Sequence, residues 1–336
     1  MLEIVPKVSV VIPNYNHERY LPQRIESVLQ QTYQDIEILI LDDCSPDNSR
    51  EVIERYAALD NRIRVVYNEQ NSGSTFKQWN KAFALVRGKY IWIAESDDYA
   101  APDLLASLVA QLEKDAEVGL AYCGSNTVDE NNGPLAVLDD FYTDLDPVLW
   151  TKDFVLPGRS LITDFMSYRN IIPNASAVVM RRSRVEQIGG ADDSFRLNGD
   201  WIFWASLIAD TKVAFVARKL NYFRFHLNNV RSKTAVNGVA LSELTRVVRI
   251  MQQYGKPKDL FLDRMIRTLT DMWFVGIVAN NIPLKKHREI FANLKAIDAN
   301  FGLRFRQYIR QYILNDKFKG LRALLGINRI YTIGRK

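Results

Sequence analysis

Cysteine and histidine are scarce in this sequence, and their scarcity excludes several classes of protein. Of the 336 residues, only Cys44 and Cys123 are cysteines, and only His17, His226 and His287 are histidines. Two thiols cannot form the disulfide framework of a secreted scaffold, so we expect a reducing compartment. The same shortage excludes a zinc finger or a histidine-rich metal cage.

Long apolar runs and glycine-rich phosphate loops are lacking as well. The longest apolar candidate, residues 272–279, is shorter than the roughly 18 residues that cross a bilayer. The first residues lack the length and cleavage site of a signal peptide, and we therefore expect a cytoplasmic protein. The sequence has no G-x-x-x-x-G-K-[ST] loop, no G-x-G-x-x-G after its first apolar run and no G-x-S-x-G elbow. A ligand would therefore be bound by side chains rather than by a glycine cradle.

The net charge of +5 is unevenly distributed. Residues 285–336 hold thirteen Lys or Arg against three Asp or Glu, so the rest of the chain carries a net charge of −5. With 47% hydrophobic and 25% charged residues, the composition is that of a globular protein with ample apolar material for a core. A chain of this length predicts one large domain with an extension, or two domains.

Apolar runs alternate with helical patterns over the first 120 residues. Buried strands are predicted at residues 8–12, 36–41, 63–67 and 90–94. Helices are predicted between and after them, and one begins at Ser45-Pro46 as N-cap and first helical residue. Farther along, residues 119–174 are less regular, strands are predicted at 175–181, 213–216 and 220–225, and Asp200 opens a helix. The pattern predicts an α/β fold with a mostly parallel sheet flanked by helices.

Polar clusters follow three of these strands. They are Pro13-Asn14-Tyr15-Asn16, Asp42-Asp43 and Glu95-Ser96-Asp97-Asp98. The carboxyl ends of parallel strands share one edge of a sheet, where such folds bind ligands, so the three clusters are predicted to face one crevice. Adjacent carboxylates repel each other, and Mg²⁺ or Mn²⁺ bound to them together with phosphate oxygens relieves that repulsion.

Each candidate also has a structural interpretation. Asp97 and Asp98 would form an exposed turn, and Asp42 with Asp43 would cap the following helix. Tyr15 is either a packed loop aromatic or a platform for a base. Asp103 and Asp200 would cap helices, and His226 would be an ordinary residue after a strand. Each structural interpretation is reasonable for one residue alone. The order in which these residues follow one another along the chain makes it less reasonable that all of them are merely structural.

That order resembles family 2 glycosyltransferases with the GT-A fold. The segments that carry the resemblance are VSVVIPNYN, LDDCSPDNS, NSGSTFKQWNKAF, GKYIWIAESDD, NGDWIFW and YFRFH, within residues 5–232. The resemblance implies a GT-A catalytic domain at 1–235, with a nucleotide-sugar half of about 1–118 and an acceptor half of about 119–235. A basic helical C-terminal extension at 236–336 follows.

The resemblance also implies roles for individual residues. Pro13, Tyr15 and Asp43 would hold the nucleoside of a UDP- or dTDP-sugar, and Lys77 would contact its diphosphate. Asp98 is the expected ligand of Mn²⁺ or Mg²⁺, with Asp97 toward the ribose or the metal. Further implied residues are the metal or diphosphate contact His226, the catalytic base Asp200, and the acceptor-side residues Asn174, Ser176 and Trp201. The chain departs from the family's pattern at Glu95, where Asp is commoner, and at Gly199, where Glu is frequent.

The implied function is inverting, metal-dependent sugar transfer to a glycan or lipid-linked acceptor in surface polysaccharide synthesis. A non-catalytic nucleotide-sugar-binding scaffold and a nucleotidyltransferase are the alternatives. The missing glycine-rich loop argues against the second of these. Residues 301–336 interleave aromatic, aliphatic and basic residues. They predict either a helix at the inner face of the plasma membrane or one that packs on its own chain or a second copy. Nucleic acid is not expected, because no binding motif accompanies the charge.

Overall fold

The computed structural model describes residues 5–226, 238–279, 282–314 and 322. The chain divides into two units. The first consists of Met1–Leu161 and Ile171–His226, and the second of Ile162–Asn170 and Leu227–Lys336. Residue 235, where the sequence predicts a domain boundary, lies outside the described residues. The assignment of Ile162–Asn170 to the second unit has no counterpart in the sequence prediction.

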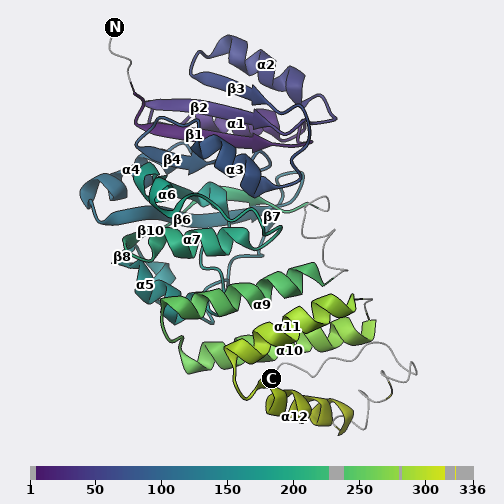
Figure 1. Ribbon diagram of the computed structural model, residues 1–336. Coiled ribbons are helices and arrows are strands. Elements are labelled where there is room, and N and C mark those ends of the chain that lie inside the picture. Colours follow the sequence, from purple (N-terminus) through teal and green to yellow (C-terminus); the bar gives the residue numbers. More distant parts are fainter. Residues whose placement is uncertain (1–4, 227–237, 280–281, 315–321, 323–336) are drawn as a thin grey trace. The chain divides into compact units, whose positions relative to one another are not determined.

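A single mixed sheet organises the first unit, with strand order β3-β2-β1-β4-β9-β6-β10-β5 (Figure 1). The strands are β1 (Val8–Asn14), β2 (Ile36–Asp42), β3 (Ile63–Tyr67), β4 (Tyr90–Ile93), β5 (Tyr99–Ala100), β6 (Val118–Val128), β7 (Pro134–Leu135), β8 (Phe154–Pro157), β9 (Val178–Arg181) and β10 (Lys212–Arg224). The helices of this unit are α1 (Leu21–Leu29), α2 (Ser49–Leu59), α3 (Thr75–Phe83), α4 (Leu104–Lys114), α5 (Gly158–Leu161), α6 (Arg182–Ile188) and α7 (Gly199–Ile208).

The strand directions place the predicted polar clusters at one edge. β1 pairs in parallel with β2 and β4, and β2 pairs in parallel with β3. β9 is antiparallel to both β4 and β6, so β6 runs in the direction of β4, and β10 is parallel to β6. The carboxyl ends of β1, β2, β4, β6 and β10 therefore share one edge, called here the carboxyl edge. The opposite edge, where β1 to β3 begin, is the amino edge.

Side chains that alternate along the strands are buried between two helical layers. Val8, Val10 and Ile12 of β1 pack with the apolar faces of α1, α2 and α4. α3 contacts β1 and β2 from the other side, and α6 and α7 adjoin it there. Strands buried on both faces are what the continuous apolar runs predict.

Three elements differ from their predictions. α2 begins at Ser49 rather than at Pro46. The Asp42 carboxylate accepts hydrogen bonds from the Ser45 amide (3.0 Å) and hydroxyl (2.6 Å) and so holds a loop there. β6 covers the first part of residues 119–174, where no strand is predicted, and begins one residue earlier at Val118. Two glycines and the polar residues of VGLAYCGSNTV conceal it. β10 is one strand of 13 residues with register shifts, where two short strands are predicted.

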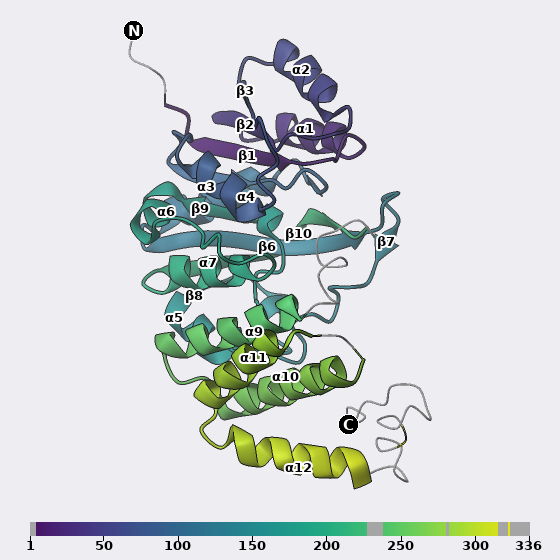
Figure 2. The same ribbon diagram turned by 45° about the vertical axis from the view of Figure 1, so that its right-hand side comes forward.

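The second unit is helical (Figure 2). Its main helices are α9 (Val239–Met251), α10 (Asp259–Ala279), α11 (Leu284–Ile297) and α12 (Phe301–Leu314). Two buried residues of α12 face rings of α10: Phe301 lies 6.2 Å from Trp273, and Tyr312 lies 4.4 Å from Phe274. The apolar side of α12 thus packs within its own unit. Most of the predicted basic segment beyond it lies outside the described residues. Every helix in the described part of the chain is too short or too polar to span a bilayer.

Candidate active site

The acidic turn, residues 95–98, follows β4 at the carboxyl edge. The Asp98 amide donates a hydrogen bond to the Glu95 carbonyl (3.1 Å) and closes the turn. It therefore presents the side chains of its three acids to different surroundings. The surroundings of each side chain indicate which carboxylate supports the turn and which is a candidate metal ligand.

Asp98 is buried beneath the turn, with 1% of its surface exposed. Its Oδ2 accepts hydrogen bonds from Asn174 Nδ2 (2.8 Å) and Ser176 Oγ (2.7 Å), and its Oδ1 accepts one from the Arg224 amide (2.9 Å). Burial, together with the nearby Asp97 charge, raises the pKa of Asp98 to about 6. These bonds occupy Asp98 inside the protein, so the structure does not favour the prediction that it is the principal metal ligand.

The same contacts involve two of the predicted acceptor-side residues. Ser176 is fully buried and Asn174 is 7% exposed. Both residues hold Asp98, and the Ser176 hydroxyl also accepts a hydrogen bond from the Glu95 amide (3.0 Å). In the structure they support the acidic turn.

A buried arginine balances the charge of the turn. Arg24 of α1 is fully buried, and its Nε donates to the Glu95 carbonyl (2.8 Å). Its Nη2 lies 4.0 Å from Asp98 Oδ2. Burial lowers the pKa of Arg24 to about 10, against the opposing effect of Asp98, and the side chain remains cationic at neutral pH. Arg24 therefore supplies a fixed positive charge beneath the acids.

Asp97 turns toward two histidines. Its Oδ2 lies 3.0 Å from His226 Nε2, and His17 Nδ1 lies 2.8 Å from Ser96 Oγ. One ligand atom each from His17, Asp97 and His226 lies within 4.8 Å of the others. Burial raises the pKa of Asp97, but the hydrogen bond with His226 and the charge of His17 outweigh it, and the net shift is downward. Two imidazoles and a carboxylate are donors that fit a divalent transition-metal ion.

Glu95 belongs to the same turn but faces α3. Its Oε1 accepts a hydrogen bond from Trp79 Nε1 (3.0 Å). Burial, with the Asp97 charge adding to it, raises the pKa of Glu95 to about 8. Three acids in four residues, each with a shifted pKa, mark this turn as a candidate functional site.

The predicted nucleoside contacts lie after β1 and β2 at the same edge. Asp43 is 4% exposed, and its carboxylate accepts hydrogen bonds from Asn68 (2.6 Å), Gln78 (2.8 Å) and both the amide (2.9 Å) and hydroxyl (2.8 Å) of Ser72. Tyr15, directly after β1, is 46% exposed. Pro13 pairs with Leu41 inside the sheet, and Lys77 is exposed on the first turn of α3. The structure thus gathers these residues around one loop cluster.

Asp200 stands in the first turn of α7, as predicted from its position before an apolar helix. A Cβ on the preceding Gly199 would lie 2.7 Å from the Phe76 ring, so α7 and α3 begin close together. Trp79 of α3 in turn contacts Glu95, which places the start of α7 near the acidic turn. Trp201, a predicted acceptor residue, is 7% exposed.

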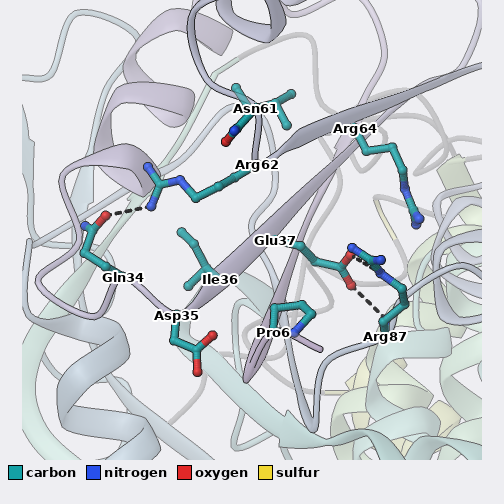
Figure 3. Close-up of a pocket in the computed structure, with 10 residues that line it drawn as sticks. Pro6, Gln34, Asp35, Ile36, Glu37, Asn61, Arg62, Arg64 and Arg87 are labelled. Carbon is teal, nitrogen blue, oxygen red and sulfur yellow. Dashed lines mark hydrogen bonds and ion pairs between the residues drawn. The ribbon is translucent and has the colours of Figure 1, made fainter. Parts of the chain in front are cut away.

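A hollow of about 370 Å³ lies at the opposite, amino edge (Figure 3). Its charged side chains have partners: Arg62 Nη1 donates to Gln34 Oε1 (2.6 Å), and Arg87 Nε donates to Glu37 Oε2 (2.9 Å). None of the predicted site residues lines it. Since ligands of parallel sheets bind beyond the carboxyl ends of the strands, this hollow is not the candidate active site.

Comparison with known proteins indicates the family to which the chain belongs. Residues 9–172 match the profile of Glycosyl transferase family 2. The putative teichuronic acid biosynthesis glycosyltransferase TuaG of Bacillus subtilis is 30% identical over 218 residues, which cover 64% of this chain and 76% of that protein. The chain belongs to glycosyltransferase family 2. It is a glycosyltransferase.

Other relatives match shorter segments or share the fold alone. Glycosyltransferase GlyG of Streptococcus pneumoniae is 42% identical over 112 residues, which cover 33% of this chain and only 37% of GlyG. S. aureus TarS 1-349, solved in complex with UDP-GlcNAc, superposes with a TM-score of 0.64 at 16% identity, over 96% of this chain and 88% of TarS 1-349. That likeness confirms the predicted GT-A type α/β fold.

The sequence interpretation missed several residues of this glycosyltransferase's candidate site. His17 lies three positions after the end of β1, so the carboxyl-edge argument applied to Asn14 and Tyr15 includes it too. Arg24, Trp79 and Arg224 stand within apolar helical or strand patterns that show no functional signal. Only the fold brings them to the acidic turn.

Proposed function

We propose that this glycosyltransferase moves a sugar from a nucleoside-diphosphate sugar to a hydroxyl of a glycan or lipid-linked acceptor in surface polysaccharide synthesis. The name of one relative and the ligands bound by two structural neighbours support this class of reaction. TuaG is named for teichuronic acid biosynthesis, TarS was solved with UDP-GlcNAc, and the mannosyltransferase PcManGT of Pyrobaculum calidifontis with GDP-Man and Mn²⁺. UDP- and dTDP-sugars are the proposed donors.

The convergence of His17, Asp97 and His226 at the carboxyl edge carries the proposal. We assign Asp97 and His226 as ligands of Mn²⁺ or Mg²⁺, in place of the predicted Asp98. An ion held there would neutralise charge on the diphosphate as it leaves the sugar. Asp98 instead holds the acidic turn in place through the hydrogen bonds that it accepts from Asn174, Ser176 and Arg224.

The remaining residues bind and orient the reactants. Tyr15, exposed after β1, stacks on the base, and Pro13 and Asp43 shape the loops around the nucleoside. Lys77 attracts the diphosphate. On the acceptor side, with Trp201 beside it, Asp200 takes the proton of the attacking hydroxyl as the bond to the anomeric carbon forms. A single base opposite the leaving group gives inversion, whereas retention by the two-carboxylate route requires a positioned nucleophile.

A basic exposed face on α12 supports a second aspect of the proposal, peripheral contact with the inner face of the plasma membrane. Arg306 and Arg310 are exposed, while Phe301 and Tyr312 on the same helix are buried. Basic side chains near a membrane are attracted to anionic lipid by about 1 kcal/mol each. Flotation of the full chain with anionic vesicles should weaken on Arg306→Glu plus Arg310→Glu. Undiminished flotation would leave packing or self-association as the role of this segment.

A donor screen tests the proposed reaction. Wild-type protein is incubated with UDP-, dTDP- and GDP-sugars plus Mn²⁺, Mg²⁺ or EDTA, and sugar release is followed by proton NMR. We expect metal-dependent turnover of at least one donor, with the first-formed anomer inverted. Donor binding without turnover under any condition would instead support the non-catalytic scaffold. Retention of the anomeric configuration would contradict the role of a single base.

A further inference from the structure

We infer that His17 is a third protein ligand of the ion, and that it makes the site select an imidazole-preferring transition-metal ion over Mg²⁺. The inference rests on the proposed metal site at Asp97 and His226 and adds a residue that the sequence motifs do not assign. It concerns the chemistry of the donor set.

Three separate segments bring the ligand atoms together. His17 comes from the loop between β1 and α1, Asp97 from the acidic turn after β4, and His226 from the residues after β10. The two imidazole rings meet edge to face, with centroids 5.6 Å apart and an interplanar angle of 90°. A group in which one ligand atom of each residue lies within 4.8 Å of the others could hold one ion.

Hydrogen bonds outside the group hold two of its members in place. The His17 Nδ1 position, 2.8 Å from Ser96 Oγ, allows Nδ1–H to donate to the hydroxyl and leaves the Nε2 lone pair for a metal. Ligating histidines are generally oriented in this way by their second ring nitrogen. Arg224 Nε donates to the Asp97 carbonyl (2.7 Å), and the Arg224 amide donates to Asp98 Oδ1, so this arginine binds the turn two residues before His226. These hydrogen bonds indicate that the side chains of the group are held in a defined arrangement.

The donor set determines which ions fit. Mg²⁺ prefers oxygen ligands and retains several of its waters. Imidazole nitrogens favour Mn²⁺, Fe²⁺, Co²⁺ or Zn²⁺ over Mg²⁺, by affinities that rise along that series. A site with one histidine tolerates Mg²⁺ better than a site with two. His17 therefore shifts the selectivity without entering the reaction itself.

The experiment measures metal binding and not activity. Full-length protein with UDP is titrated with Mn²⁺, the unbound ion is followed by electron paramagnetic resonance, and Mg²⁺ affinity is taken from competition. Nitrogen couplings in the pulsed spectrum of bound Mn²⁺ count the imidazole ligands. The variants are His17→Ala, Asp97→Ala and, as a histidine control in the second unit, His287→Ala. Thermal melts confirm that each variant is folded.

We expect His17→Ala to weaken the binding of Mn²⁺ at least about tenfold and to change the affinity for Mg²⁺ by less than about twofold. The number of imidazole ligands on bound Mn²⁺ should fall from two to one. His287→Ala should match wild type. Unchanged Mn²⁺ affinity in His17→Ala, or an equal loss for both ions, would overturn the inference while leaving Asp97 and His226 as ligands. Normal Mn²⁺ binding by Asp97→Ala would overturn the metal site itself, and the inference with it.

Discussion

The two edges of the sheet differ in how their charged side chains are arranged. At the amino edge, charges are paired: Arg62 lies 2.7 Å from Asp60, and Arg87 lies 2.9 Å from Glu37. Hydrogen bonds from Ser9 and Arg87 outweigh burial and lower the pKa of Glu37. At the carboxyl edge, three acids share one turn, and the pKa of Glu95 rises to about 8.

The paired charges of the amino edge stabilise the fold. The clustered acids of the carboxyl edge are an arrangement suited to chemistry. Paired charges with ordinary or lowered acid pKa values are the usual structural arrangement. Like charges held together in a buried turn reduce stability unless a cation joins them, and such shifts cluster at functional sites. Substitutions at the carboxyl edge should therefore affect turnover or ligand binding as well as stability, whereas substitutions at the amino edge should affect stability alone.

The largest expected effect is on turnover. Asp200→Asn removes the proposed base at the carboxyl-edge end of α7, and we expect donor turnover to fall by about 10²–10⁴-fold. Affinity for UDP should stay within about twofold, as measured by calorimetry. The matched control is Asp210→Asn, just beyond the other end of the same helix, which should keep wild-type turnover. Equal turnover in both variants would contradict the assignment of the base.

Stability distinguishes the two adjacent acids of the turn. Asp98→Ala leaves Arg24 without its ion-pair partner and three donors without their acceptor, and we expect a loss of about 3–5 kcal/mol in the free energy of unfolding. The side chain of Asp97 is 22% exposed, so Asp97→Ala should lower the free energy of unfolding by less than half as much. Urea denaturation measures both values. Similar losses would mean that the two acids do not have the separate roles described.

A pH-dependent effect is expected at the amino edge. Glu37→Gln should lower stability at pH 7 by about 1–2 kcal/mol, because hydrogen bonds to a carboxylate are lost. The folded pKa of Glu37 is below its usual value of 4.5, so its contribution is complete above that pH. It is lost as the pH falls through the folded pKa, and the gap between wild type and variant should close there. A gap that widens with acid would contradict this, as urea melts from pH 7 to 3 would show.

The smallest expected effect concerns Lys77. Since this side chain is exposed, Lys77→Ala should weaken UDP binding only about two- to fivefold, less than 1 kcal/mol. The loss should shrink at high salt. Lys114→Ala, at the amino-edge end of α4, is the control and should bind UDP as wild type does. A loss independent of salt would argue against an electrostatic contact.

Much of the fold was predictable because its strands are continuous β-branched runs. β1 to β4 lie where those runs predict, and their common direction follows from the alternation with helices. β6 was not predictable in the same way. Its glycines and hydroxyl residues look like a loop in isolation, and its burial comes from pairing with β9 and β10, which are distant in sequence.

The candidate site was predictable in location but not in detail. Polar clusters after parallel strands indicated the carboxyl edge. Which of Asp97 and Asp98 faces outward depends on the turn closed by the Asp98 amide, and no spacing rule contains that geometry. His17 and Arg24 reach the turn from one neighbouring segment, residues 15–24, and the first lies close to Asp97 while the second lies close to Asp98.

Metal-dependent binding of UDP tests the central claim most directly. Calorimetric titrations compare wild type, Asp97→Ala at the carboxyl edge and Glu37→Gln at the amino edge, each with Mn²⁺ and with EDTA. We predict that wild type and Glu37→Gln bind UDP with Mn²⁺ and lose at least tenfold in affinity with EDTA, while Asp97→Ala binds weakly in both. Wild-type affinity in Asp97→Ala with Mn²⁺, or UDP binding by wild type that EDTA leaves unchanged, would contradict the account.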